Sequence, residues 1–341
     1  MNTAKQIEQL KQLLTGNRKT DRLVIFKRID EAVEKNETEV LNECMRIAVN
    51  YMPNNPEDMM DEFSKYEETY TIAFINITLF QEVSLFKRIS LMNYLIKYVA
   101  KKEEIERTGE TPLYSFDSPF QKQLFDKLTG NRFKYTESTY PYYLIYSQYA
   151  MLLTEYGDNA NAYQYYSKAH VTNPMSTEVL FQLLILFKQS RQSEDLFRLG
   201  QWMINVASTS KGIAHALQMM AYSLYLDGKF EESYAFYFQS LKYDENPFPG
   251  LNEEINGVLT ALKREDPYNL SKVDISNLFI GKTYKPQPNE LVYDVMREYI
   301  IVEFTKQNYL EVLNYTNEYM KIRPRDTKVS NIHKKALEAL N

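Results

Sequence analysis

Most of the chain repeats one local pattern. Apolar residues recur every three to four positions over long stretches, and short stops of Gly, Pro, Asn or Asp interrupt them. This spacing puts the apolar residues on one face of an α-helix, so it predicts successive helices with brief connections. Residues 69–80 have the β-branched content of a strand, but the helical spacing continues through them, and we predict helix over residues 57–106. The pattern as a whole predicts an all-α fold.

A helix pair is readable within residues 143–176. Tyr149 and Ala150 belong to the apolar face of a first helix, Gly157 supplies a turn, and Ala162 lies on a facing second helix. Small residues at Ala150 and Ala162 allow two antiparallel helices to approach closely, while neighbouring rings fill the remaining space. Pro174 then stops the second helix.

The same order of residues recurs downstream. Residues 214–247 form a second good copy, and residues 177–210 and 293–326 form weaker ones. A polar helix over 327–340 would cap the array, because the last repeat needs one wettable face. On these copies the segment from about residue 140 to 340 resembles the tetratricopeptide repeat (TPR) family.

The resemblance implies antiparallel helix pairs stacked into a right-handed TPR-like superhelix. First helices would line a concave groove that holds a peptide or a partner helix. The groove positions that the family implies are occupied by amides, aromatics and flexible apolar residues. They lack the Lys and Asn residues with which chaperone-binding members of the family hold a terminal carboxylate, which argues against a chaperone adaptor of that kind. The predicted partner-binding residues are Gln148, Met151, Phe181, Gln182, Ile185, Gln189, His215, Gln218, Tyr222 and Tyr225. The same tyrosines could serve packing between repeats instead.

Three regions are expected along the chain. Residues 1–106 form an N-terminal helical region, in which helices at 21–35 and 37–52 are either a divergent repeat or an unrelated pair. Residues 107–141 contain three prolines and two glycines, and we predict a connector over 107–140, with a short helix possible at 119–128. Residues 141–341 hold the TPR-like repeats and the capping helix. A second irregular stretch covers residues 266–289.

Composition removes several classes of protein. Ten glycines in 341 residues are too few for the strand-to-helix turns of an open α/β enzyme. The single cysteine, Cys44, cannot form an internal disulfide or a thiolate metal cage. No metalloprotease, serine-hydrolase, phosphate-loop or dinucleotide-binding motif occurs. We therefore predict no enzyme activity, no cofactor and no metal site.

The isolated reactive residues have structural explanations. Cys44 lies on a predicted helix among apolar residues and is expected to be a small buried thiol. His170 ends a second helix, where a cation would complement the helix dipole. His333 is expected in solvent, whereas the repeat register places His215 in the groove.

Charge and hydropathy limit the partners. The net charge of −5 argues against a nucleic-acid binder, although residues 321–341 are locally basic. No stretch is long and apolar enough to span a membrane, and the first residues lack the apolar core of a signal peptide. We expect a cytoplasmic protein that binds a protein or peptide, and its apolar surface would also allow a homodimer.

The predicted function is a non-catalytic binding scaffold that uses the groove of the repeats. One alternative is a peptide-responsive bacterial regulator with a TPR-type sensor domain, although residues 1–52 show no convincing helix-turn-helix. The other is an enzyme whose site lies in the N-terminal helical region, for which the sequence offers no ligand set.

Overall fold

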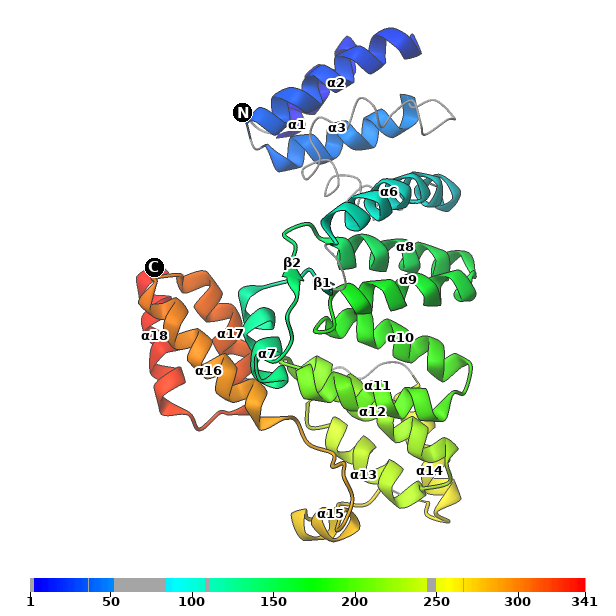
Figure 1. The fold of residues 1–341 in the computed structure, drawn as a ribbon, viewed down its shortest axis with the longest axis vertical. Helices are drawn as coiled ribbons and strands as arrows, with labels where there is room; N and C mark the ends of the chain where they lie inside the picture. The colour runs from blue at the N-terminus through cyan, green and yellow to red at the C-terminus, as the bar shows by residue number, and fades with distance from the viewer. Residues whose placement is uncertain are drawn as a thin grey trace. The chain divides into compact units, whose positions relative to one another are not determined.

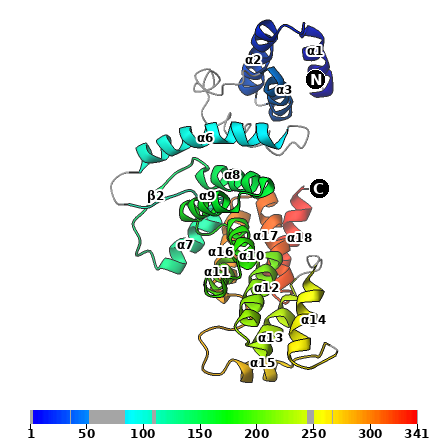
Figure 2. The same cartoon turned by 90° about the vertical axis from the view of Figure 1, so that its right-hand side faces the viewer.

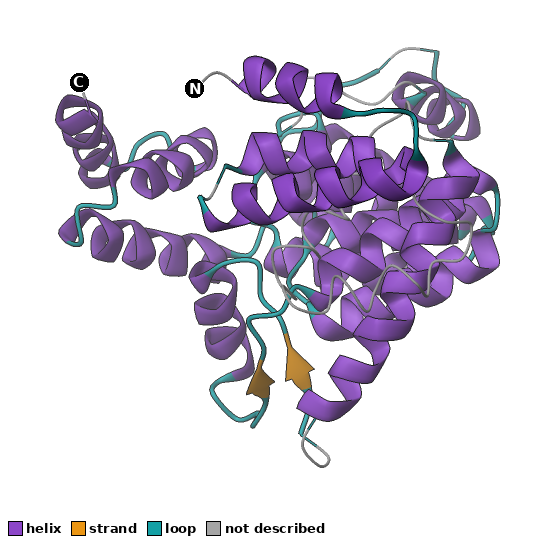
Figure 3. Ribbon diagram, turned by 90° about the horizontal axis from the view of Figure 1, so that it is seen from above, coloured by secondary structure: helices purple, strands orange, loops and turns teal. Residues whose placement is uncertain are grey.

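The computed structural model describes residues 3–35, 37–51, 84–107, 111–243, 250–265 and 267–340. These residues form sixteen helices and two strands of two residues each, which confirms the all-α class (Figures 1 and 3). The first elements are α1 (Thr3–Leu13), α2 (Arg18–Glu34), α3 (Thr38–Tyr51), α6 (Leu85–Glu106), β1 (Leu113–Tyr114), α7 (Pro119–Thr129), β2 (Thr136–Glu137), α8 (Tyr142–Tyr156) and α9 (Asn159–Thr172). The remaining helices are α10 (Thr177–Gln189), α11 (Ser193–Val206), α12 (Ser210–Leu226), α13 (Phe230–Ser240), α14 (Leu251–Ala261), α15 (Lys272–Leu278), α16 (Glu290–Thr305), α17 (Tyr309–Ile322) and α18 (Thr327–Leu340).

The chain divides into two compact units. Unit 1 comprises Met1–Ser115 and Ser138–Ala169, and unit 2 comprises Phe116–Glu137 and His170–Asn341. The ranges 1–106, 107–140 and 141–341 stay a prediction about domain organisation.

In unit 1, α1, α2 and α3 pack against one another around buried residues such as Ile25, Ile29 and Met45. The turn between α1 and α2 is held by the buried carboxylate of Asp21, which accepts the backbone N–H groups of Thr15 at 2.7 Å and Gly16 at 2.8 Å. These bonds satisfy backbone donors that would otherwise be left unpaired at the turn.

A second group of helices in unit 1 contains α6, α8 and α9 as far as Ala169. Arg88 on α6 pairs with Glu155 on α8 at 2.6 Å, and Tyr149 on α8 donates to Asn93 on α6. The ring of Tyr149 meets that of Tyr165 on α9, with 4.6 Å between centroids. The predicted pairing of tyrosine-rich helices within residues 143–176 is thereby confirmed.

Unit 2 is a succession of neighbouring helix pairs. Each helix from α10 to α13 packs on the next one in the chain, α16, α17 and α18 pack together, and α7 packs on α16. Figures 1 and 2 both show α17 lying beside α18.

Residues 34 positions apart touch repeatedly in unit 2. Two of these contacts join corresponding turns of α10 and α12, whereas the other two involve Asp227, which follows α12, and Tyr268, which lies between α14 and α15. The contacts are a ring stack between Phe181 and His215, an ammonium–ring contact between Lys188 and Tyr222, a hydrogen bond from Ser193 to Asp227, and a ring stack between Tyr234 and Tyr268.

Local sequence signals account for many helix ends. Ser118 caps α7 and Pro119 follows it as the first helical residue, which confirms the short helix predicted within residues 107–140. Gly157 ends α8 with a φ of 92°, a conformation that glycine adopts without strain. The capping helix predicted over 327–340 is α18.

Other helix predictions are met in part. The helix predicted over 57–106 is present as α6 from Leu85, and its earlier portion lies outside the described residues. The stretch at 266–289, predicted as irregular, contains the seven-residue helix α15, which a Ser271–Asp274 capping box starts.

Candidate partner-binding surface

The helix α10 has one buried face and one face that solvent reaches. Leu180, Leu183 and Leu184 point into the core, whereas Phe181 and Gln182 remain half-buried. Ile185 lies one turn further along and is also half-buried. The helical period therefore places one aromatic, one amide and one aliphatic side chain on the same solvent-accessible face of α10.

The neighbouring helix α12 is buried over almost its whole length. From Gly212 to Leu224, every residue is buried except His215 and Tyr222, and Tyr225 follows as half-buried. These three positions are seven and three residues apart, so they lie on one face of the helix. We call Phe181, Gln182, Ile185, His215, Tyr222 and Tyr225 the α10–α12 surface.

A ring stack joins the two helices across this surface. The rings of Phe181 and His215 have centroids 3.8 Å apart and planes inclined by 14°. Tyr222 and Tyr225 are also in ring contact, with centroids 6.3 Å apart. Such contacts limit the rotamers of the side chains and so hold the surface in one arrangement before anything binds.

An ion pair closes one end of the surface. Lys188 at the end of α10 pairs with Glu254 at the start of α14, and its Nζ also lies 4.8 Å from the centroid of the Tyr222 ring. The hydroxyl of Tyr237 donates to the other carboxylate oxygen of Glu254 at 2.7 Å. Burial, together with Glu254, raises the pKa of Tyr237 well above its usual range, so this hydroxyl keeps its proton.

The α10–α12 surface itself carries no carboxylate or ammonium group, and the nearest charged pair, Lys188 and Glu254, is mutually compensated. The arrangement suits hydrogen bonds to a peptide backbone and contacts with uncharged side chains.

The other predicted site residues lie in different surroundings. Gln148 and Gln218 are buried, with exposed fractions of 8% and 1%, so we leave both out of the contact surface. Gln189 is exposed at the end of α10, beyond the α10–α12 surface. Met151 is 38% exposed on α8, in unit 1, whereas the α10–α12 surface belongs to unit 2.

Two histidine predictions are wrong. Burial lowers the pKa of His170 to about 4, so this side chain is neutral near pH 7 and does not supply the expected cation. His333 was expected in solvent, but it is half-buried, and its Nδ1 lies 2.8 Å from Oγ1 of Thr316. The burial of His170 and the contact of His333 with Thr316 on α17 both arise only in the folded chain.

The thiol of Cys44 is fully buried, as predicted, and burial raises its pKa to about 12. A thiolate nucleophile is therefore not formed at neutral pH. Among the residues that the structure describes, no group of three or more His, Cys, Asp or Glu side chains could hold a metal ion.

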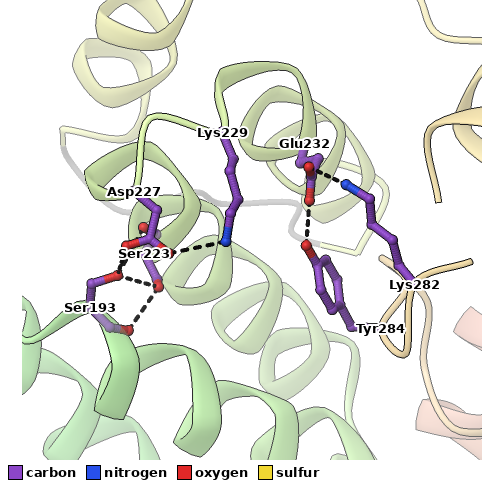
Figure 4. Close-up of polar contacts among 7 residues, drawn as sticks. All are labelled: Ser193, Ser223, Asp227, Lys229, Glu232, Lys282 and Tyr284. Carbon is purple, nitrogen blue, oxygen red and sulfur yellow. Dashed lines mark hydrogen bonds and ion pairs between the residues drawn. The ribbon is translucent and has the colours of Figure 1, made fainter.

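A serine-rich cluster lies where α11 begins and α12 ends (Figure 4). Ser193 donates to Asp227 at 2.6 Å, and its Oγ is 3.0 Å from that of Ser223. Ser223 in turn donates to the carbonyl of Ser193 at 2.8 Å. Ser223 is fully buried, and Lys229 contacts Asp227 rather than a serine, so the cluster joins two helix ends and contains no activated nucleophile.

Glu254 was missed by the sequence prediction. It lies 32 residues after Tyr222, close to the 34 residues that separate Lys188 from Tyr222. Extending the spacing of 34 residues from Tyr222 leads to Asn256, two residues beyond Glu254, so the repeat register alone would not have identified Glu254.

Comparison with protein-family models and with curated proteins gives no match to this sequence. Within the described ranges, none of the helices combines the length and the apolar character needed to cross a membrane.

Proposed function

We propose that the chain is a non-catalytic scaffold that holds a protein or peptide partner on the α10–α12 surface. The observation that carries this proposal is the narrow row of half-buried aromatic side chains on α12, a helix whose other central residues are buried. Aromatic side chains dominate the binding energy of many protein interfaces, because they bury a large area with few rotatable bonds.

The architecture that we propose is a TPR-like superhelix, with α10, α12 and α14 as first helices. The contacts at a 34-residue separation support this architecture. The ion pair of Lys188 with Glu254 also supports it, because it joins α10 to α14, the first helices of two pairs that lie on either side of the α12 pair in the sequence. In such an array the first helices share one face, and this face would take an extended segment of the partner. A cytoplasmic site of action is part of the proposal.

The proposal is tested with the double variant Q182A/Y222A. Proteins that co-purify with the tagged wild-type chain are identified by mass spectrometry, and the affinity of a purified partner is then measured directly. We expect the variant to weaken binding by about tenfold or more, because it removes one aromatic anchor and one amide from the interface. Its free energy of unfolding should change by less than about 1 kcal/mol, because both side chains are half-buried.

The matched control is Y163A/Q164A, which removes an exposed tyrosine and an exposed glutamine from the second helix α9. Binding should be unchanged in this control. If Q182A/Y222A lost stability while binding normally, the two residues would be packing residues and the proposal would be wrong.

A further inference from the structure

Unit 2 contains a pocket lined by four lysines and no acidic residue. It has a volume of about 520 Å³, and its lysines come from separate segments of the chain. Lys242 follows α13, Lys272 is the first residue of α15, and Lys282 and Lys285 follow α15. We call these four residues the lysine pocket.

Only one of the four ammonium groups is neutralised within the described residues. Lys282 pairs with Glu232, which also accepts a hydrogen bond from Tyr284 (Figure 4). Lys242 donates to the neutral amide of Gln239 at 3.0 Å. Lys272 and Lys285 make no ion pair with any residue that the structure describes.

The uncompensated charges act on one another. Lys242 and Lys272 line the same pocket, and burial together with the charge of Lys272 lowers the pKa of Lys242. Repulsion of this kind disfavours the folded state unless an anion relieves it.

The remaining lining suits an anion that carries an apolar part. Gln239, Ser276 and Gln287 offer hydrogen-bond donors, and Ile275, Phe279 and Pro286 form an apolar wall. The volume falls within the range of pockets that hold small molecules. Three positive charges without an ion pair among the described residues match a phosphate monoester or a diphosphate better than a single carboxylate.

We propose that the lysine pocket binds a small phosphate-bearing molecule, whose phosphate oxygens contact Lys242, Lys272 and Lys285 and whose organic part lies against Ile275 and Phe279. This site is separate from the α10–α12 surface and does not depend on the function proposed for that surface.

A nucleic acid fits these observations less well. The four lysines of this site are gathered in one pocket, whereas nucleic-acid binders carry an extended basic track, and the chain as a whole has a net charge of −5.

The test is calorimetric titration of the full chain with inorganic pyrophosphate at low ionic strength. The informative variant is K272Q/K285Q, which removes two lysines without ion pairs and leaves the Lys282–Glu232 pair intact. The matched control is K334Q/K335Q, which removes two exposed lysines from α18. We expect the dissociation constant to rise by about tenfold or more in K272Q/K285Q and by less than about twofold in the control.

The melting temperature and the circular dichroism of K272Q/K285Q show whether this variant is still folded. Without pyrophosphate, K272Q/K285Q should melt at the same temperature as the wild type or higher, because repulsion is relieved, and its circular dichroism should be unchanged. The proposal would be overturned by undetectable binding to the wild type at millimolar pyrophosphate, or by equal weakening in both variants, which would indicate non-specific attraction. Binding of an aspartate-rich peptide or an oligonucleotide, but not of pyrophosphate, would also overturn it.

Discussion

His170 shows how the surroundings of one residue decide its chemistry. Its Nδ1 is buried without a hydrogen-bond partner among the described residues, and burial lowers its pKa from 6.5 to about 4. In the unfolded chain the same imidazole takes up a proton at its ordinary pKa. Between these two pKa values the unfolded state therefore binds more protons than the folded state, so stability falls as the pH is lowered.

The replacement His170→Gln should remove this pH dependence. Stability that His170 contributes is fully present above about pH 6.5 and is lost as the pH falls toward 4. The loss from this residue should reach about 2–3 kcal/mol by pH 4.5, given 1.36 kcal/mol for each pKa unit. Urea unfolding at pH 7.5, 5.5 and 4.5 measures the free energy of unfolding of the wild type and the variant. If the difference between the two free energies were the same at all three pH values, the lowered pKa of His170 would be contradicted.

Single residues were predictable where the local sequence decides their conformation, and less so where a neighbouring helix does. The turn at Gly157 and the burial of Cys44 follow from the chain around them. The neutral state of His170 depends on its burial in the folded chain, and the contact of His333 with Thr316 depends on the packing of α17 against α18. A single sequence does not report which helix covers which residue.

Among the elements, α11 and α12 pack closely because of one glycine. A Cβ atom placed on Gly200 of α11 would lie 2.6 Å from Cγ of Met220 on α12, a side chain that is itself buried. Gly257 on α14 has far more room, since the nearest atom, Oη of Tyr225, is 3.9 Å from the corresponding position.

These two glycines should respond oppositely to alanine. We expect Gly200→Ala to destabilise the protein by about 1–3 kcal/mol, because the overpacked contact outweighs the better helix propensity. Gly257→Ala should stabilise it by about 0.5–1 kcal/mol, because only the propensity changes. Chemical unfolding of both variants tests this pair, and a G200A variant as stable as the wild type would show that the helices are not in such close contact.

Helices were the most predictable elements, because apolar periodicity and end signals are both local. The bounds of α18 match the prediction, and those of α7 differ by one residue at its end. The short helix α15 was not predicted, since seven residues between prolines and glycines give too little periodicity to distinguish helix from loop.

At the scale of the whole molecule, the sequence repeats its pattern about every 34 residues, and several contacts in unit 2 join residues that are 34 positions apart. The all-α class could be predicted because every helix pair carries the pattern. The candidate site was less predictable, because the repeat register names first-helix positions but not their exposure, and Gln148 and Gln218 are buried. The lysine pocket was not predicted at all, since its lysines become neighbours only in the folded chain.

The central claim is that a partner occupies the α10–α12 surface, and site-directed photo-crosslinking tests it most directly. A benzophenone amino acid replaces Gln182 in one variant of the full chain and Gln164, on the second helix α9, in another. The account predicts that irradiation links the partner to the chain from position 182 and not from position 164. Cross-linking from position 164 alone, with none from position 182, would contradict it.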